Sequence, residues 1–466
     1  MGKWIFAMTS IIIFRITFSL DSSKSCRKKT SSLGGEELIC HNATTSLLKN
    51  NDFILSKTHW FTCENCTLNT VDSSTFNFTK NSINYLYLIS SQIFAIKGRA
   101  FNKLKFLKVI NLRNNSVTDL DPESFTNLTR VTQVDLSHNS LRILTNKMFH
   151  KLTNLDLLNL NHNNIYYIQP DAFKGLSNLR HLYLSNNRLE RLEGYVFKYL
   201  PNLLLLYLEH NSIISIDSFA FANLSNLNAL YLNNNSINFL TQYNFKPLNN
   251  LVDLQLRRNS LVEIQTSAFN GLTNLKHLHL GNNRLRTVKR YGFVGLDNLQ
   301  NLDLINNDFK HFDLSYVESL KKLETLWLEQ NRLSNLSIDV KLDPLNSLYS
   351  LGINDNNLTV LNYKLLYNKM PNIRDVFIYN NSWNCELLIN MQQFFQEQNV
   401  SLCMSFDCNP EKNKHLLEES SCEVMIDHKE EDSGEDFEAD FVAEVGTCAR
   451  ISVILILVNI QMLIFM

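Results

Sequence analysis

The sequence contains little glycine and proline, with 13 and 7 residues respectively among 466. Glycine-rich phosphate-binding loops and the frequent turns of a β-sandwich both need more of these residues, so neither is expected. No excess of charge of one sign exists either, because 44 basic residues face 45 acidic ones. Without a general basic field, the chain is not expected to bind nucleic acid.

Cysteine is absent from the middle of the chain, since all nine cysteines lie at or before Cys66 or at or after Cys385. Hydrophobic residues make up 44% of the sequence, which is enough for a large core and too many for a disordered chain. A long core-forming segment with cysteines only at its ends indicates a regular structure.

Motifs of common enzymes are missing as well. The sequence has no Gly-x-Ser-x-Gly, no Walker loop and no His-Glu-x-x-His. We therefore expect neither an enzyme nor a cofactor.

The first 19 residues are expected to be a signal peptide. Lys3 precedes a mostly apolar run, residues 4–18, which is too short to span a bilayer. Eleven Asn-x-Ser/Thr sequons support an extracellular location and are candidate glycosylation sites: Asn42, Asn65, Asn77, Asn114, Asn127, Asn223, Asn234, Asn335, Asn357, Asn380 and Asn399.

The other end carries a hydrophobic tail, residues 451–466, behind an acidic spacer, residues 423–450. As a helix the tail would be about 24 Å long, shorter than a hydrocarbon core of about 30 Å. It resembles the signal for a glycosylphosphatidylinositol (GPI) anchor, and a short transmembrane span is the alternative. Cleavage before Cys448 would remove this ninth cysteine, whereas a retained span would keep it.

A 24-residue repeat fills the middle of the chain. Within each repeat the pattern is Leu-x-x-Leu-x-Leu-x-x-Asn-x-Leu, as from Leu179 to Leu189, and a phenylalanine follows ten residues after the asparagine. The asparagines recur at Asn115, Asn139, Asn163, Asn187, Asn211, Asn235, Asn259, Asn283, Asn307 and Asn331, and then, at steps of 25, at Asn356 and Asn381.

This pattern predicts an α/β solenoid. The alternating leucines make a short strand with its leucines inward, and successive strands pair into a parallel sheet on the concave side. The buried asparagine is expected to bond backbone groups of its own turn and of the next coil. The phenylalanines are expected to stack as a spine inside the convex side.

The ends of an open stack must be covered. We assign residues 20–57 to an N-terminal cap, 58–384 to about fourteen repeats and 385–422 to a C-terminal cap with an amphipathic helix. Two sets of four cysteines are candidates for disulfides, each with three possible pairings: Cys26, Cys40, Cys63 and Cys66, and Cys385, Cys403, Cys408 and Cys422. A zinc site at Cys63 and Cys66 is disfavoured, because both occupy inward repeat positions.

On these residues the chain resembles extracellular leucine-rich repeat proteins of the typical 24-residue class. The resemblance includes the motif Asn-Ser-Trp-Asn-Cys at residues 381–385, which opens a C-terminal cysteine cap. The architecture is similar to tethered adhesion proteins of the connectin and chaoptin type, to Toll ectodomains and to secreted immune proteins of insects. The resemblance implies a horseshoe with disulfide-stabilised caps that works by binding.

Outward side chains on the concave face stand six, four and two residues before each asparagine. These positions place His277 and His279 on one strand, between Asp253 and Asp303 on its neighbours. These four residues are weak candidate metal ligands, and the more economical interpretation is a polar patch on a solvated sheet.

Aromatic residues recur in the column four residues before the asparagine. Tyr183, Tyr207 and Tyr231 stand on three consecutive strands, and Trp327 and Phe377 lie further along. Exposed aromatic side chains often bind protein partners, so we take these five as the candidate partner-binding residues. Alternatively, the rings only stabilise one another.

The expected function is binding of a protein partner at the cell surface, in adhesion or as a receptor component. The partner would be an extracellular protein or a like molecule on another cell, and the tail would hold the protein to the outer side of the plasma membrane. The alternative is a secreted or tethered protein of innate immune recognition.

Overall fold

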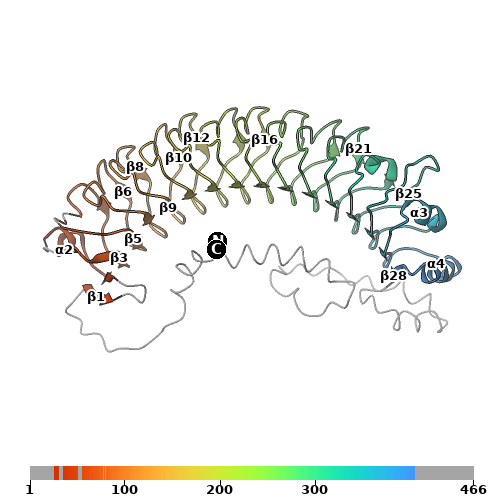
Figure 1. The fold of residues 1–466 in the computed structure, drawn as a ribbon, viewed down its shortest axis with the longest axis horizontal. Helices are drawn as coiled ribbons and strands as arrows, with labels where there is room; N and C mark the ends of the chain where they lie inside the picture. Colours follow the sequence, from red (N-terminus) through yellow and green to blue (C-terminus); the bar gives the residue numbers. More distant parts are fainter. Residues whose placement is uncertain (1–25, 31–34, 51–54, 77, 79, 405–466) are drawn as a thin grey trace.

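The computed structural model describes residues 26–30, 35–50, 55–76, 78 and 80–404. They form a curved solenoid whose strands line the concave side (Figure 1). The expected signal peptide, acidic spacer and hydrophobic tail lie outside the described residues. Within the described part of the chain, no helix is long and apolar enough to cross a membrane.

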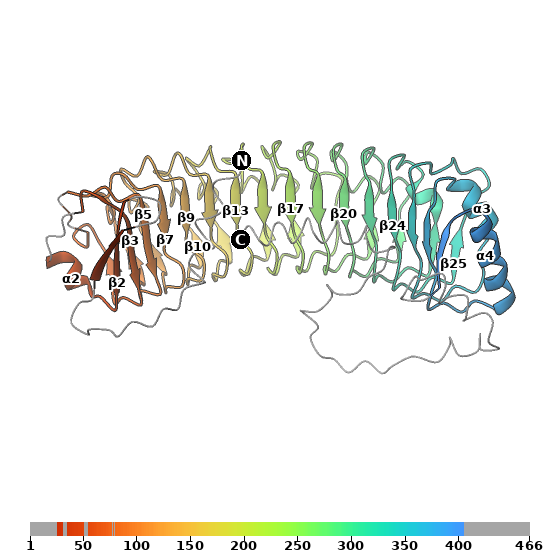
Figure 2. The same ribbon diagram turned by 60° about the horizontal axis from the view of Figure 1, so that its bottom comes forward.

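One 17-stranded sheet forms the concave face. Its strands lie side by side in Figure 2, and each pairs with the next in register, as Leu158 with Leu182. The fourteen strands within residues 58–384 are β3 (Thr58–Glu64), β5 (Tyr85–Ile89), β7 (Val109–Asn111), β9 (Gln133–Asp135), β11 (Leu157–Asn159), β13 (His181–Tyr183), β15 (Leu205–Tyr207), β17 (Ala229–Tyr231), β18 (Asp253–Gln255), β20 (His277–His279), β22 (Asn301–Asp303), β24 (Thr325–Trp327), β26 (Ser350–Gly352) and β27 (Asp375–Phe377).

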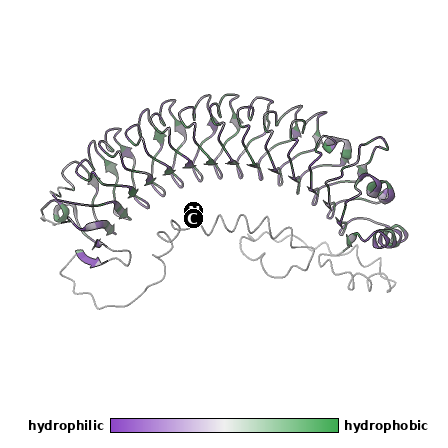
Figure 3. Ribbon diagram, viewed as in Figure 1, coloured by the Kyte–Doolittle hydropathy of each residue, from purple (hydrophilic) through white to green (hydrophobic). Residues whose placement is uncertain are grey.

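The convex side consists mostly of turns and of short strands in small parallel sheets. These strands are β4 (Thr70–Val71), β6 (Ala95–Ile96), β8 (Asp119–Leu120), β10 (Ile143–Leu144), β12 (Tyr167–Ile168), β14 (Arg191–Leu192), β16 (Ser215–Ile216), β19 (Glu263–Ile264), β21 (Thr287–Val288), β23 (His311–Asp313) and β25 (Asn335–Ser337). Two short helices, η1 (Leu314–Val317) and α3 (Tyr363–Lys369), add to this side. Hydrophobic residues recur in every coil (Figure 3).

The predicted phenylalanine spine is present. Ten phenylalanines are fully buried at corresponding positions, and neighbouring rings stack with centroids 6.0 to 6.3 Å apart in nearly every step. They are Phe76, Phe101, Phe125, Phe149, Phe173, Phe197, Phe221, Phe245, Phe269 and Phe293. Because most of these rings stack on the rings of the neighbouring coils, the spine links the repeats into one core.

The asparagine ladder is also present, with one difference. Asn211 Oδ1 accepts from the Leu189 backbone N–H at 3.0 Å, while Nδ2 donates to the carbonyls of Leu184 and Leu208 at 3.0 and 3.1 Å. Its bonds therefore join its own turn to the preceding coil. The expectation of bonds to the next coil was wrong in direction, because the asparagine reaches back toward the N-terminus.

A second asparagine ladder runs along one rim of the solenoid. Each member donates from Nδ2 to the backbone carbonyl 25 residues earlier, as Asn202 does to Ser177 at 2.8 Å. The members are Asn154, Asn178, Asn202, Asn226, Asn250, Asn274 and Asn298. Their spacing of 24 residues was visible in the sequence, but exposed asparagines in loops gave no reason to expect a structural role.

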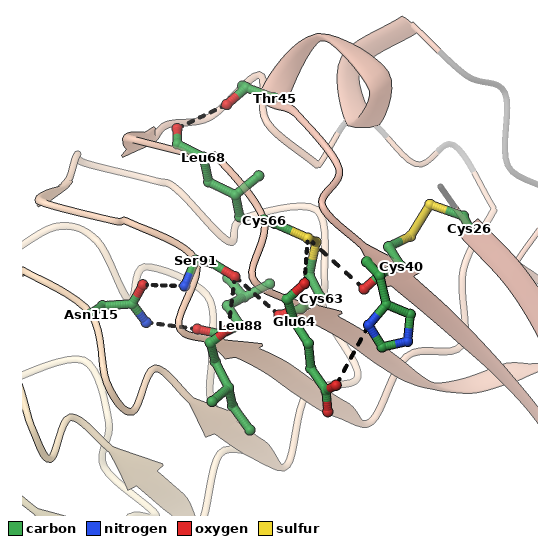
Figure 4. Close-up of a disulfide and its surroundings, with 12 residues drawn as sticks. Cys26, Cys40, Thr45, Cys63, Glu64, Cys66, Leu68, Leu88, Ser91 and Asn115 are labelled. Atoms are coloured by element: carbon green, nitrogen blue, oxygen red, sulfur yellow. Dashed lines mark hydrogen bonds and ion pairs between the residues drawn. A yellow bond between two sulfur atoms is a disulfide. The ribbon is translucent and has the colours of Figure 1, made fainter. Parts of the chain in front are cut away.

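The N-terminal cap adds two strands, β1 (Cys26–Thr30) and β2 (Glu36–His41), and the short helix α2 (Thr45–Asn50). β1 pairs with β2 as a hairpin, and β2 pairs in parallel with β3. Figure 4 shows the surroundings of the first disulfide, Cys26–Cys40. The second disulfide is Cys63–Cys66 and lies in the first repeat. The disulfides therefore pair cysteines that are near one another in sequence, which four cysteines alone did not determine.

The C-terminal cap consists of α4 (Cys385–Glu397) and β28 (Ser401–Cys403), which extends the sheet beside β27. Asn384 caps the helix by accepting from the Leu387 N–H at 2.7 Å. The predicted apolar face is confirmed, since Leu388, Met391 and Phe395 are buried against the last coil. Cys385 is exposed and Cys403 is buried, while Cys408 and Cys422 lie outside the described residues.

Candidate functional site on the concave face

Three columns of outward side chains cover the concave sheet. In the coil of β15 they are Leu205, Tyr207 and, just past the strand, Glu209, all of which are half-buried. The intervening Leu206 is fully buried in the core. Because strand side chains alternate between faces, residues in these columns can differ from repeat to repeat without disturbing the core.

Tyr183, Tyr207 and Tyr231 form a stacked row on β13, β15 and β17, here termed the tyrosine ladder. The strand register places the three residues directly opposite one another. Ring centroids lie 4.6 and 4.5 Å apart, with interplanar angles of 7° and 0°. The predicted row is therefore present, at the spacing of the strands.

The faces of these rings are largely covered. Tyr231 is only 9% exposed, and the other two are half-buried, because each ring lies against its neighbour. Burial also raises the pKa of all three phenols above its ordinary value. What the tyrosine ladder offers a partner is thus ring edges and neutral hydroxyl groups, rather than fully exposed ring faces.

Two carboxyl groups, of Asp253 and Glu209, adjoin the tyrosine ladder and act electrostatically on Tyr231. Burial raises the pKa of Glu209 above its ordinary value, although Ser185 opposes this shift by donating from Oγ to Oε2 at 3.3 Å. A partner that covers this part of the sheet would therefore meet two carboxyl groups beside the ring edges.

A shallow hollow of about 600 Å³ lies beside the tyrosine ladder. It includes His181 and Leu205, on two strands of the ladder, with Leu204 and Val252 as further apolar walls. Residues of the second asparagine ladder, such as Asn226 and Asn250, border it. Lys276 also lines the hollow, which therefore combines apolar walls with polar and charged groups, as protein-binding surfaces do.

The predicted neighbours of the two concave histidines are confirmed, but they do not form a metal site. His277 pairs with Asp253 in register, and His279 with Asp303. Yet no group of three or more His, Cys, Asp or Glu residues in the described ranges could hold a metal ion. Instead, Nδ2 of Asn301 lies 2.6 Å from Nδ1 of His277.

Arg257, which the sequence analysis did not single out, explains how the carboxylate of Asp303 is neutralised without a metal ion. Arg257 Nε donates to Asp303 Oδ2 at 2.6 Å. Burial opposes ionisation of Asp303, but the neighbouring imidazole of His279, with Nδ1 3.8 Å from Oδ2, and the charge of Arg257 hold the pKa of Asp303 below its ordinary value. The guanidinium therefore supplies the positive charge that a metal ion would have brought.

Trp327 and Phe377 form a second aromatic group near the C-terminal cap. They stand on β24 and β27, with β26 between them, and their ring centroids are 5.7 Å apart at an interplanar angle of 59°. The residue between them in register is Gly352. The two rings can meet across one strand because glycine has no side chain there.

The sequon asparagines are accessible. Of the ten described ones, nine are exposed and Asn234 is half-buried, whereas Asn77 lies outside the described residues. Eight adopt a positive φ, a conformation that asparagine tolerates better than most residues. These eight are Asn42, Asn65, Asn114, Asn127, Asn223, Asn234, Asn380 and Asn399. The local backbone geometry thus explains, independently of glycosylation, why asparagine occupies these positions.

Comparison with known sequences agrees with this geometry. The family described as leucine rich repeat matches residues 81–141, 105–165, 153–213, 201–261 and 249–309. The chain is a leucine-rich repeat protein. No curated protein sequence matches it.

Solved leucine-rich repeat structures share its fold. A leucine-rich repeat protein of Leptospira interrogans is 23% identical, with a TM-score of 0.61 over 78% of this chain and 89% of that one. A chain of the Toll–Spatzle complex of Drosophila is 22% identical, with a TM-score of 0.59 over 79% of this chain and 57% of that one. A chain of the LRIM1/APL1C complex is 20% identical, with a TM-score of 0.52 over 77% of this chain and 72% of that one. At sequence identities this low, the likeness shows a shared fold alone.

Proposed function

We propose that this leucine-rich repeat protein is an extracellular recognition protein that binds a protein partner through the tyrosine ladder. The observation that carries the proposal is the row of Tyr183, Tyr207 and Tyr231, stacked 4.5 to 4.6 Å apart beside a shallow hollow. Tyrosine suits such a surface because it combines a rigid apolar body with a hydroxyl that hydrogen-bonds.

Two features favour binding over mutual stabilisation alone. The rings point away from the core, so the fold does not need three tyrosines at these positions. Structural neighbours also occur in complexes with proteins, as the structures of Toll with Spatzle and of FLRT2 with Latrophilin 3 and Unc5D state. For this chain, those complexes support a protein as the class of ligand.

The cellular role we favour is adhesion or participation in a receptor, with the protein held at the outer side of the plasma membrane by its C-terminal tail. The alternative is innate immune recognition. It is supported by the likeness to a chain of the Toll–Spatzle structure, which is described as a hub in development and innate immunity.

A cell-aggregation assay separates these roles. Cells that do not adhere to one another are made to express the full-length protein. Cells that express an unrelated membrane protein serve as the reference. Clustering of the expressing cells alone supports adhesion through like molecules. Absence of clustering, together with binding of a soluble host or microbial protein, supports immune recognition.

A further inference from the structure

A second group on the concave face is centred on Gly352. It consists of Trp327, Glu329, Gly352, Asn354 and Phe377 and is termed here the acceptor notch. A Cβ on Gly352 would lie 2.2 Å from Glu329 Oε1 and 2.7 Å from Trp327 Cε3. The Glu329 carboxyl group and the indole ring therefore occupy the space that a side chain on Gly352 would fill.

Two hydrogen-bond acceptors in the acceptor notch have no donor. Glu329 Oε2 and Asn354 Oδ1 are both buried atoms without a hydrogen-bond partner. Asn354 as a whole is 3% exposed. The two residues stand on adjoining coils, which the bond from the Gln330 N–H to the Asn354 carbonyl joins at 3.2 Å. Unpaired buried acceptors are costly, so a ligand that donates to both would gain an unusually strong interaction.

The local charge determines which donor fits. Asp303 and Asp355 both act electrostatically on Glu329, and Arg257 is the cation that opposes them. Arg257 already donates to Asp303 at 2.6 Å. The acceptor notch thus has surplus negative charge. Trp327 and Phe377 add aromatic rings, which attract cations.

We propose that the acceptor notch binds one basic side chain, preferably arginine, of a protein partner. A planar guanidinium presents several N–H donors in a fork, so one group can reach acceptors on two coils about 4.8 Å apart and also stack on an aromatic ring. This inference rests on the proposed function, because it takes the partner to be a protein that covers the concave face. It adds a chemical requirement: a basic residue that reaches the strands next to the C-terminal cap.

Binding in the acceptor notch is linked to pH. Burial, with lesser contributions from Asp303 and Asp355, raises the pKa of Glu329 to about 8, against the opposing effect of its own backbone N–H and of Arg257. His279, next to Asp303, is a further titratable group nearby. A cation favours the ionised form of Glu329, so affinity rises as the pH increases from 6 to 9. With a pKa near 8, the rise is at least about tenfold.

The test titrates the full-length protein, purified in mild detergent, with N-acetyl-arginine amide by calorimetry at pH 6 and pH 9. The matched probe is the citrulline analogue, which keeps the shape of arginine without its charge. We expect saturable binding of the arginine probe, at least tenfold tighter than the citrulline probe at pH 9. Glu329→Gln should weaken arginine binding at least tenfold at pH 9 and little at pH 6, where the carboxyl group is already neutral.

Glu190→Gln is the control variant, because Glu190 is an exposed carboxyl group that precedes β14 on the convex side. It should leave binding of the arginine probe unchanged. Gly352→Ala keeps every charge but displaces the Glu329 carboxyl group, so it should also weaken binding. Circular dichroism of each variant verifies that it is folded.

Equal affinity for the two probes, or full affinity in Glu329→Gln at pH 9, would overturn the inference. The proposed function is tested separately, because loss of partner binding in a tyrosine-ladder variant does not depend on the arginine probe. If the tyrosine variant loses its partner while Glu329→Gln binds the arginine probe normally, the recognition surface stands and the acceptor notch is rejected.

Discussion

Arg257 and Asp303 form an ion pair across an intervening coil, with Nε 2.6 Å from Oδ2, although they are 46 residues apart in sequence. Gly281 lies in the coil between them, and a Cβ there would stand 2.9 Å from Asp303 Oδ2. The missing side chain is what lets the guanidinium pass over this coil. Three consecutive repeats are thereby joined on the concave face by one side-chain contact.

Removing this contact should destabilise the solenoid. Asp303 is 3% exposed, so Arg257→Met leaves a buried carboxylate without its cation. Because Arg257 itself is partly exposed, we expect a loss of about 1–3 kcal/mol in the free energy of unfolding. Arg286→Met, which replaces an exposed arginine one coil further on, is the control and should change stability by less than about 0.5 kcal/mol. Urea unfolding followed by circular dichroism measures both variants.

The ion pair of Arg257 and Asp303 makes the stability of the fold depend on pH. The folded pKa of Asp303 lies below its ordinary value, so the stabilisation is present above the unfolded pKa, about 3.9, and is lost as the pH falls through the folded value. The difference in stability between the wild type and Arg257→Met should therefore be largest near neutral pH and shrink below about pH 4. A difference that stays constant down to pH 3 would contradict this account of the pair.

The two asparagine ladders should differ in their contribution to stability. Asn211→Ala leaves one buried N–H and several carbonyls of the neighbouring turns without partners, and we expect a loss of about 2–4 kcal/mol. Asn202→Ala, in the same repeat, removes one exposed bond to Ser177 and should cost less than about 1 kcal/mol. Thermal unfolding of the two variants provides the comparison. Equal losses would show that the ladder of Asn211 does not stabilise the fold more than the ladder of Asn202.

Two phenylalanines separated by one residue provide a test of the spine. Phe221 is fully buried between Phe197 and Phe245, whereas Phe219 is 55% exposed on the convex side. Phe221→Ala should cost about 3–5 kcal/mol because it leaves a cavity in a continuous stack. Phe219→Ala should leave the midpoint of chemical unfolding almost unchanged. A comparable loss in the free energy of unfolding of both variants would contradict the view that the buried phenylalanine spine stabilises the fold.

The repeating core of the molecule could be predicted from the sequence because it depends on residues that recur. Leu206, Asn211 and Phe221 each occupy a column in which almost every repeat has the same residue type, so spacing alone places them. The tyrosine ladder was predictable for the same reason, since Tyr183 and Tyr207 are 24 residues apart and the strands pair in register.

Interactions that depend on single repeats could not be predicted in this way. Arg257 reaches Asp303 only because a glycine happens to stand at position 281, and Glu329 folds over Gly352 for a similar reason. Such contacts depend on side-chain conformations and on gaps in a column, which periodicity does not describe. The polar patch around His277 and His279 was predictable, but its ion pair was not, because the spacing of the repeats does not indicate that Arg257 reaches Asp303 two coils away.

Residues 451–466, outside the described part of the chain, are predicted to be replaced by a GPI lipid. Treating intact cells that express the protein with a phosphatidylinositol-specific phospholipase should then release it into the medium. Retention of the protein on treated cells, with Cys448 detected in the mature chain, would favour the short transmembrane span.

The central claim is that the tyrosine ladder binds the partner, and the most direct measurement compares two double variants for cell clustering or partner binding. Tyr183→Ala with Tyr207→Ala removes two rings of the ladder, whereas Tyr195→Ala with Phe219→Ala removes an exposed pair on the convex side that is stacked at 5.2 Å. We predict that the ladder variant loses at least about thirtyfold in affinity, corresponding to about 2 kcal/mol, with secretion and thermal stability unchanged. The convex variant should bind like the wild type. Normal binding by a folded ladder variant would contradict the account and direct attention to Trp327 and Phe377.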